Sequence, residues 1–540
     1  KRKSDMPYFN LSYEALIKEI EKHEVVSFDI FDTLLIRNVY EPRDVFSLLD
    51  REYEDRLPFR FSQVREDVEQ ELLLKGEPDL YQIYDTIGKQ YHLSSLKSQK
   101  LLRNEIEKEK TILTVRAKMH ECLQYCISKG KKIYLISDMY FTKKILQEIL
   151  EHFGIHGYEE IIVSCEYGCS KQNGLFEILR GKISNSSWLH IGDNHEADYL
   201  AAIKNGGDAF EILSPIKMME LSAYNILLDD TKDLERKVVL GILAARIFND
   251  PFMLYHSNGM PRIKDLRDFG YLFIAPLIVS FMVWLFSVLK QDKDSLVIFS
   301  ARDGWLLQKI YHMFRKKYKW ENAPQDIYLW ISRKAICIVA EGNETYEEER
   351  KNYLNYLKSF KLEYYKNIYF FDFMSRGTCQ SKLEQITGRN MQGVYFQRSL
   401  SGDIRKDSMQ VFGFFKEQNA YEKNLRIFAM CDFLECILTS PQPSFWKIDN
   451  QGYPVYEQEQ RTMEQMQSVE RIHTGILEYC NKFATLIKNP KENALSPDFC
   501  DEILKCTDAE FSVLDIPELK NFMLDDCLER NKNTGKDIWA

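Results

Sequence analysis

The sequence predicts an α/β protein with two doubly wound parallel sheets, a helical insertion in the first and a mostly helical C-terminal region. Two observations predict this class. Short apolar runs rich in β-branched residues alternate with helical patterns, and they do so in two separate series. The chain has 540 residues, 45% of them hydrophobic, which is enough for several cores and roughly three or four domains.

The first series predicts one α/β domain at residues 23–214, after a helical lead-in at 1–22. Its expected strands are residues 25–31, 131–137, 161–166, 187–193 and 208–213. Helical patterns at 141–152 and 174–182 separate later strands. Strands that alternate with helices form parallel sheets, so we expect a Rossmann-like sheet.

A long insertion follows the first strand, at residues 41–127. It is charged and helical, and it shows no strand pattern. An insertion of this size at that place predicts a helical cap over the carboxyl edge of the sheet.

A helical connector is expected at 215–294, and it contains an uncharged run at 269–289. The run is long enough to span a bilayer, but Pro276 interrupts it and α/β patterns flank it. A helix that is apolar all round can also be the buried helix of a large protein, and we favour that interpretation over a membrane span.

The second series predicts a Rossmann-like α/β domain at 295–420. Its strands are expected at 295–300, 326–332, 367–373, 393–396 and 411–415. Residues 421–540 are expected to be mostly helical, with one turn-rich patch at 439–456.

Charge and cysteine content narrow the functional classes. There are 72 Lys and Arg against 81 Asp and Glu, a net charge of −9, and nucleic-acid binders typically carry a basic stripe instead. The 12 cysteines include no CxxC pair, so we expect buried thiols in a reducing cytosol rather than disulfides or zinc. No signal-peptide pattern lies near Lys1. We expect a cytoplasmic protein, with association at the inner face of the membrane as an alternative.

Four motifs of the first series fall at predicted strand ends, where doubly wound sheets bind ligands. They are FDIFDTLL with Asp29, YLISD with Ser137, GCSKQNGLF with Lys171, and HIGDNHEAD with Asp193 and Asp198. A carboxylate can attack phosphorus, a hydroxyl and an ammonium can hold phosphate oxygens, and further carboxylates can bind Mg²⁺. Each of these residues taken alone could instead lie in a turn, cap a helix or sit on the solvated surface. Four such motifs in order, each at the end of a predicted strand, favour a functional site.

This set of motifs resembles the haloacid dehalogenase (HAD) superfamily over residues 23–214. The resemblance implies that Asp29 is a nucleophile and that Ser137 and Lys171 bind phosphate. It implies Mg²⁺ held by Asp29, the backbone carbonyl of Phe31 and Asp193, with Asp198 in support. It also implies that the insertion is a type-one cap and that the substrate is a small phosphorylated molecule.

One position departs from the phosphatases of this superfamily. They carry a second Asp, the general acid and base, two residues after the nucleophile, where this chain has Phe31. Loss of such a group typically costs about 10²–10⁴-fold in rate. Asp32 follows, and we favour a turn-stabilising role for it over that of a substitute acid. Dehalogenase and phosphonatase branches also lack the second Asp, so the resemblance still allows turnover.

Polar residues also follow the strands of the second series. They are Arg302 and Asp303 in FSARDG, Arg333 in ISRKA, and Asp372, Arg376 and Thr378 in FDFMSRGTC. Gathered at one edge, they could hold a phosphate or sugar phosphate. The alternative is that Asp303 and Thr378 cap helices and that the arginines lie on the surface or brace the domain. FDFMSRGTC also faintly resembles the phosphate loop of phosphoribosyltransferases.

The whole layout is similar to large bacterial HAD proteins associated with polysaccharide-making glycosyltransferases, which have segments like SARDG, SRKA and LECILTSPQPSFW. Two functions from different classes follow. The first is a Mg²⁺-dependent hydrolase or phosphotransferase acting on a sugar-linked phosphate in polysaccharide biosynthesis. The second is a weakly catalytic or non-catalytic module that binds phosphorylated glycans beside a glycosyltransferase partner or fused domain. A transferase-like second α/β domain is a further alternative.

Overall fold

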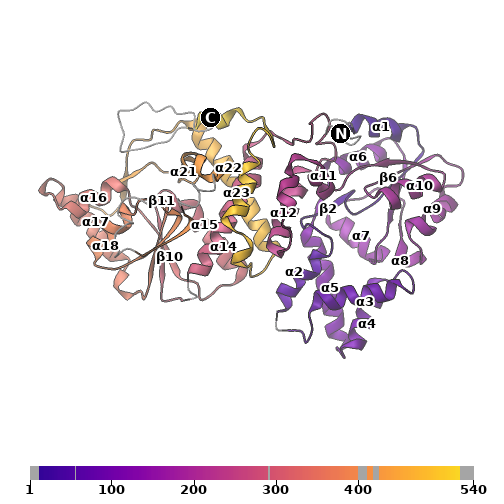
Figure 1. Cartoon of the computed structure of the whole chain (residues 1–540), viewed down its shortest axis with the longest axis horizontal. Coiled ribbons are helices and arrows are strands. Elements are labelled where there is room, and N and C mark those ends of the chain that lie inside the picture. The colour runs from indigo at the N-terminus through magenta and orange to yellow at the C-terminus, as the bar shows by residue number, and fades with distance from the viewer. Residues whose placement is uncertain (1–10, 55, 290–291, 399–409, 417–424, 523–540) are drawn as a thin grey trace. The chain divides into compact units, whose positions relative to one another are not determined.

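The computed structural model describes residues 11–54, 56–289, 292–398, 410–416 and 425–522 (Figure 1). These residues form two compact units. The first runs to Arg262 and includes the short later segments Thr485–Asn489 and Ala509–Val513. The second runs from Ile263 and takes most of the C-terminal region.

The first unit contains a five-stranded parallel sheet, as expected from the first series. Its strands are β1 (Val25–Phe28), β4 (Lys132–Ser137), β5 (Glu160–Val163), β6 (Trp188–Gly192) and β7 (Asp208–Glu211). They are arranged in the order β5-β4-β1-β6-β7. Because β1 is central and pairs with both β4 and β6, residues that follow these three strands meet at one edge.

Helices cover this sheet. They are α1 (Tyr13–Glu21), α6 (Ala117–Ser128), α7 (Lys143–His152), α8 (Ser164–Tyr167), α9 (Leu175–Ile183) and α10 (Ala201–Lys204). One face packs Val25, Ile136 and Ile162 against Phe176 and Leu179 of α9. Alternate strand residues face opposite sides of a sheet, so both faces of these strands need an apolar residue, and the strands read as continuous apolar runs.

The insertion after β1 is helical, as expected, but its limits differ from the expected 41–127. It contains α2 (Asp44–Tyr53), α3 (Phe61–Leu73), α4 (Leu80–Gln90) and α5 (Ser95–Ile112). It is closed by an antiparallel pair of β2 (Leu35–Arg37) and β3 (Leu113–Val115). The expectation of no strand was therefore wrong, because a three-residue strand is too short to show a pattern. The last expected segment, α6, belongs to the sheet layer and packs against β4.

The expected helical connector is divided between the two units. The first unit takes α11 (Pro215–Leu221), η5 (Ala223–Leu228) and α12 (Leu234–Ile247). The second takes one long helix made of α13 (Leu266–Phe269), η6 (Gly270–Ile274) and α14 (Ala275–Val288). The most apolar 18-residue stretch of this helix has a mean hydropathy of 2.2, and 83% of it is buried, as expected of a core helix. Pro276 lies inside this helix, two residues after the π-helical stretch η6, where the backbone hydrogen bonding already departs from the α-helical pattern.

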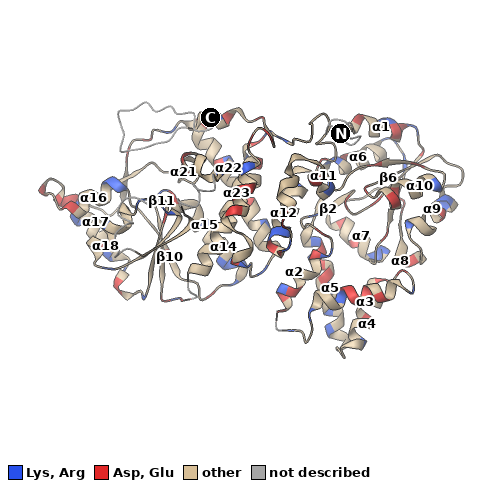
Figure 2. Ribbon diagram, viewed as in Figure 1, with Lys and Arg blue, Asp and Glu red and all other residues tan. Residues whose placement is uncertain are grey.

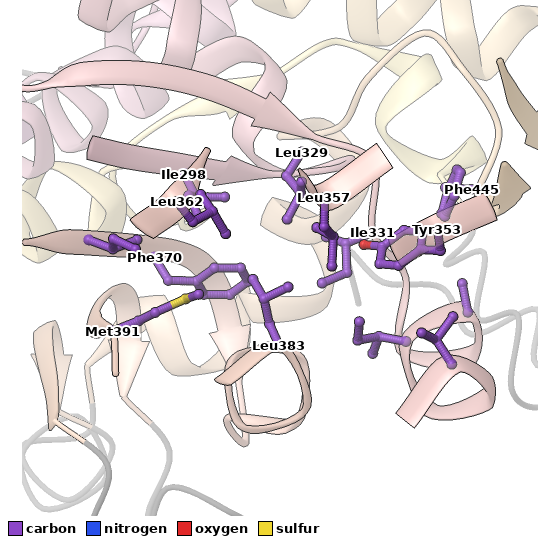
Figure 3. Packing of buried hydrophobic residues seen from close by; sticks show 14 of the residues in the cluster. Ile298, Leu329, Ile331, Tyr353, Leu357, Leu362, Phe370, Leu383, Met391 and Phe445 are labelled. Carbon is purple, nitrogen blue, oxygen red and sulfur yellow. The ribbon is translucent and has the colours of Figure 1, made fainter. Parts of the chain in front are cut away.

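The second unit contains another five-stranded parallel sheet. Its strands are β9 (Leu296–Ser300), β10 (Gln325–Leu329), β11 (Ile368–Ser375), β12 (Gln392–Arg398) and β13 (Gln410–Lys416), in the order β10-β9-β11-β12-β13. Its flanking helices are α15 (Gly304–Tyr318), α16 (Arg333–Glu341), α17 (Glu347–Ser359) and α18 (Thr378–Thr387). Figure 3 shows Ile298 and Phe370 of one face packed with Leu329, Leu357 and Leu383.

The C-terminal region is mostly helical and belongs largely to the second unit. Its elements are α20 (Arg426–Ala429), α21 (Cys431–Ile437), β14 (Phe445–Ile448), β15 (Pro454–Tyr456), α22 (Met463–Leu486) and α23 (Pro497–Lys505). The patch at 439–456, expected to be turns, contains the antiparallel pair β14–β15. Shorter elements are β8 (Arg262–Ile263), β16 (Val513–Leu514), η7 (Glu344–Tyr346), η8 (Leu362–Tyr364), η10 (Glu492–Ala494) and η11 (Pro517–Asn521).

Candidate active site

Asp29 lies at the centre of the first sheet's carboxyl edge. It directly follows β1, and its backbone N–H donates to the carbonyl of Ile191 in β6 at 2.9 Å. Its side chain is almost fully buried, with the residue 6% exposed. The chain then turns sharply, because the N–H groups of Leu34 and Leu35 both donate to the carbonyl of Ile30.

Lys171 joins two of the acidic residues. It begins the short helix η3 (Lys171–Asn173), and its buried Nζ lies 2.5 Å from Oδ1 of Asp29 and 2.5 Å from Oδ1 of Asp198. Its own backbone N–H donates to Oδ1 of Asp138 at 2.9 Å. Burial alone would lower the pKa of Lys171, but the carboxylates of Asp198 and Asp29 raise it. The lysine is therefore charged and fixed in place.

Asp193 and Asp198 follow β6 and complete the acidic group. One oxygen from each of Asp29, Asp193 and Asp198 lies within 4.8 Å of the other two. Asp198 is held on both oxygens: its Oδ2 accepts from the N–H of Asn194 at 2.9 Å, and its Oδ1 contacts His190 Nε2 at 3.0 Å as well as Lys171. Asp29 and Asp193 are thus the carboxylates with oxygens left for a cation, and Asp198 fixes Lys171.

The electrostatics of the three acids differ. Burial raises the pKa of Asp29 to about 7, although Lys171 lowers it. Burial also raises the pKa of Asp193 well above its usual range, with further contributions from Asp32 and Asp29. Burial acts in the same direction on Asp198, but Lys171 and His190 outweigh it and hold its pKa below the ordinary value. A divalent cation would stabilise the ionised forms of two neighbouring carboxyl groups whose pKa values are raised.

Ser137 ends β4 at the same edge and is buried. Within the described residues its hydroxyl makes no hydrogen bond to the protein, so it is available to a ligand. Neither Ser137 nor its neighbour Asp138 caps the helix that follows. The N-cap of α7 is Thr142, and Asp138 instead accepts from Lys171. Another buried hydroxyl, Oγ1 of Thr33, lacks a partner among the described residues.

Phe31 and Asp32 take different directions after Asp29. Phe31 is buried, 6.4 Å from the ring of Phe141 and with the guanidinium of Arg37 4.3 Å above its own ring. Asp32 has a left-handed backbone (φ 57°), which Asp tolerates better than most residues. Its N–H donates to the carbonyl of Leu35 at 2.7 Å, which fits the expected role in the turn.

The Asp32 side chain also bears on the site. It makes no hydrogen bond or ion pair within the described part of the chain, and burial raises its pKa despite Arg37 and Arg116. It is close enough to Asp193 to be the largest charge effect on that residue's pKa. The role of substitute acid therefore stays open beside the structural one.

The cap lies against this edge. Glu109 of α5 accepts from Nε of Arg37 at 2.7 Å, and the N–H of Leu80 in α4 donates to the carbonyl of Tyr140 at 2.8 Å. Inside the cap, the fully buried Arg65 pairs with both oxygens of Glu105, each at 2.9 Å. Figure 2 shows acidic and basic residues interspersed along these cap helices. The insertion thus reaches the strand ends that carry the site, as the cap interpretation requires.

Sequence reasoning missed three residues that position the site. His190 links Ser27 Oγ, at 2.8 Å, to Asp198. Arg116 is fully buried and donates to the carbonyl of Asp32 at 2.6 Å. Asp138 holds the backbone of Lys171. His190 could have been found from the sequence, because it is a polar residue between Leu189 and Ile191 in an apolar run. Nothing in the residues near Arg116 indicates its role.

Comparisons with known proteins find distant structural similarity over about a third of the chain. No protein-family model and no curated protein matches the chain. Solved structures similar to it are HAD-superfamily enzymes. They include a 2-haloacid dehalogenase from Pseudomonas syringae (15% identity, TM-score 0.27) and a HAD phosphatase from Thermococcus onnurineus (21%, 0.26). Each match covers 35% of this chain and 86% of the other.

A HAD hydrolase from Bacillus subtilis, described as bound to magnesium, is 17% identical with a TM-score of 0.24, over 35% of this chain and 88% of its own. At such identities and scores, no chemistry transfers from these neighbours.

The structure brings together four of the six residues expected to form a second site. At the carboxyl edge of the second sheet, burial raises the pKa of Asp303, Glu435 and Asp372 raise it further, and Arg302 and Arg333 lower it. Arg376 is exposed, and nothing in the described structure joins it to this group. Thr378 begins α18 but makes no capping hydrogen bond.

Proposed function

We propose that the first unit is a Mg²⁺-dependent HAD-type hydrolase or phosphotransferase that acts through Asp29 on a small phosphorylated, sugar-linked substrate. The observation that carries the proposal is the buried junction in which Lys171 contacts both Asp29 and Asp198 at 2.5 Å, beside Asp193 and the uncommitted hydroxyl of Ser137. A lone ion pair in a core would not need a third carboxylate with raised pKa at the same edge.

The donor set fits a hard cation. Carboxylate oxygens of Asp29, Asp193 and Asp198 converge within 4.8 Å, and such oxygens are the ligands that Mg²⁺ prefers. Asp29 and Asp193 would hold the ion, with Asp198 in support, and the carbonyl of Phe31 would be a further ligand. Bound there, Mg²⁺ would neutralise charge on the phosphoryl oxygens and keep Asp29 ionised at neutral pH.

The residues have separate roles in the proposed reaction. Asp29 attacks phosphorus, so that a bond from its carboxylate oxygen to phosphorus forms while the bond to the leaving oxygen breaks. Lys171 holds Oδ1 of Asp29, which orients the carboxylate, and its charge with the Ser137 hydroxyl binds the transferring group. Water, or an acceptor hydroxyl in a phosphotransferase, then attacks phosphorus and frees Asp29.

Phe31 sets the limit of this chemistry. Its ring supplies no proton to the leaving oxygen, so alkoxide leaving groups depart slowly unless another acid acts. This observation supports a second candidate, in which the unit binds phosphorylated glycan precursors and a glycosyltransferase partner does the chemistry. In either case we propose a cytoplasmic protein of polysaccharide biosynthesis that takes a small phosphorylated molecule.

Calorimetry and phosphate release distinguish the candidates. The full chain should bind Mg²⁺, and Asp193→Asn should abolish binding, while Asp85→Asn on the exposed face of the cap should not. With Mg²⁺, an aryl phosphate should be hydrolysed by the wild type but not by Asp29→Asn. Mg²⁺-dependent binding of a sugar phosphate without turnover of any phosphate would favour the binding module. Absence of Mg²⁺ binding would reject both.

A further inference from the structure

The candidate active site of the first unit is closed to solvent. Asp29 is 6% exposed, Lys171 3% and Ser137 1%, so a substrate reaches them only when part of the chain moves. The cap helices α2 to α5 lie against this edge of the sheet, and the N–H of Leu80 donates to the carbonyl of Tyr140 where they meet it. The cap is therefore the element whose movement would open the site.

The cap joins the sheet layer through two linkers. Residues 38–43 lead from β2 into α2, and residues 113–116, which include β3, lead from α5 into α6. The linkers lie side by side, because the backbone N–H of Asn38 donates to the carbonyl of Ile112 at 2.8 Å and β2 pairs with β3. A body attached by two neighbouring linkers can rotate about them, since a few backbone torsions absorb the change.

Helix α12, which follows the last strand of the first sheet along the chain, contacts both linkers. It packs against α2 and β2 (Figure 1). A Cβ at Gly241 would lie 2.3 Å from the backbone of Val39, so the helix touches the first linker directly. Just beyond the end of α12, the side chain of Asn249 holds the second linker. It accepts from the N–H of Ala117 at 2.8 Å and donates to the carbonyl of Val115 at 3.0 Å.

Two ion pairs also join α12 to the first cap helix. Nη2 of Arg51 in α2 lies 2.9 Å from Oε1 of Glu235, whose side chain is almost fully buried. Nζ of Lys237 lies 3.0 Å from Oδ1 of Asp44, the buried first residue of α2. Rotation of the cap would separate these charges, and separation of buried pairs is unfavourable. Helix α12 thus opposes the movement that would open the site.

We propose that α12 is a strap that limits how far the cap opens and so restricts the first site to small substrates. The inference rests on the proposed function, because it concerns the substrate of that same site. The strap holds both linkers and α2, so the cap moves only as far as these contacts allow. A small phosphate needs a narrow opening, whereas a phosphate with a large leaving group needs a wider one. Specificity would then depend on a helix outside the HAD-like domain expected at residues 23–214.

Hydrogen exchange at Leu80 measures cap opening without any need for activity. Glu235→Gln removes one charge of the pair with α2, and Gly241→Ala pushes α12 away from the first linker. In both variants the peptide that contains Leu80 should exchange about fivefold faster or more, with peptides from β1 and β4 unchanged. Asp230→Asn is the matched control, because the half-exposed Asp230 pairs with Arg236 of α12, and its exchange should equal that of the wild type. Unchanged exchange in a folded Glu235→Gln protein would overturn the strap.

Turnover tests the restriction on substrate size. Acetyl phosphate is the small probe and 4-methylumbelliferyl phosphate the large one, and both have leaving groups that need little protonation. With Mg²⁺, Glu235→Gln should raise kcat/KM for the large probe relative to the small one by about threefold or more, mainly through KM. Asp230→Asn should leave this ratio unchanged. An unchanged ratio in Glu235→Gln despite faster exchange would overturn the size restriction. If no protein hydrolyses either phosphate, the proposed function fails and the size restriction with it, and the exchange result alone decides whether α12 is a strap.

Discussion

Gly192 is the position where one added methyl group should test the first site most sharply. It ends β6, and a Cβ there would lie 2.3 Å from Cγ and 2.4 Å from Oδ2 of Asp198. Ordinary van der Waals contact begins near 3.4 Å, so Gly192→Ala must move the Asp198 carboxylate by about 1 Å. That carboxylate holds Lys171 at 2.5 Å and accepts from Asn194.

Displacement of Asp198 should release Lys171 from its position beside Asp29. Overpacking of this kind costs about 1–3 kcal/mol of stability, and a 1 Å misplacement near reacting groups can cost about 10²-fold in rate. We expect Gly192→Ala to fold with a lower thermal midpoint and to hydrolyse an aryl phosphate about 100 times more slowly, with the loss mainly in kcat.

The matched control is Gly181→Ala. Gly181 lies in α9 with nothing within 4 Å of an added Cβ, so its activity should be unchanged and its stability equal or slightly higher. Aryl phosphate hydrolysis and thermal unfolding are measured for both variants. Wild-type turnover in Gly192→Ala would refute the reasoning, because it would mean that the position of Asp198 and Lys171 does not matter.

Three further predictions follow. Because Phe31 supplies no proton, aryl phosphates should turn over faster than alkyl phosphates; equal rates would show that Asp32 or a cap residue acts as the acid. Arg65→Met leaves the buried carboxylate of Glu105 with the hydrogen bond from Tyr84 but without a counter-charge, so it should cost about 3–5 kcal/mol in urea unfolding. Arg43→Met, which breaks an exposed 3.4 Å pair, should cost about 1 kcal/mol or less. Burial lowers the pKa of His473 to about 4, so the unfolded chain takes up a proton on this histidine at a higher pH than the folded protein does. The free energy of unfolding should therefore fall by about 2 kcal/mol between pH 7 and pH 5. His473→Gln should remove that part of the pH dependence.

Local pattern was sufficient for the two sheets. Strands β1, β4 and β6 are buried on both faces and read as continuous apolar runs, which made them visible. Parallel pairing then required Asp29, Ser137 and Asp193 to meet at one edge, whatever the loops between them did. The short pair β2–β3 and the hairpin β14–β15 were not visible, because three or four residues carry too little periodicity.

Contacts between distant segments were beyond the sequence. Arg116 reaches the carbonyl of Asp32 across 84 positions, and Arg65 reaches Glu105 across 40. Nothing in the residues near Arg116 distinguishes it from a surface arginine. The uncharged run at 269–289 has a composition that suits both a membrane span and a buried core helix. Only the packing around α14 shows that it is buried.

The sequence by itself determined which residues stand at strand ends, because strand order along the chain and the rule of parallel pairing leave those positions little freedom. Only the tertiary structure decided how they are used. It showed Lys171 between two carboxylates and Asp138 on the Lys171 backbone rather than on a helix. The physical reason is that pairing of charges depends on distances of a few ångströms between segments, and no local propensity encodes those distances.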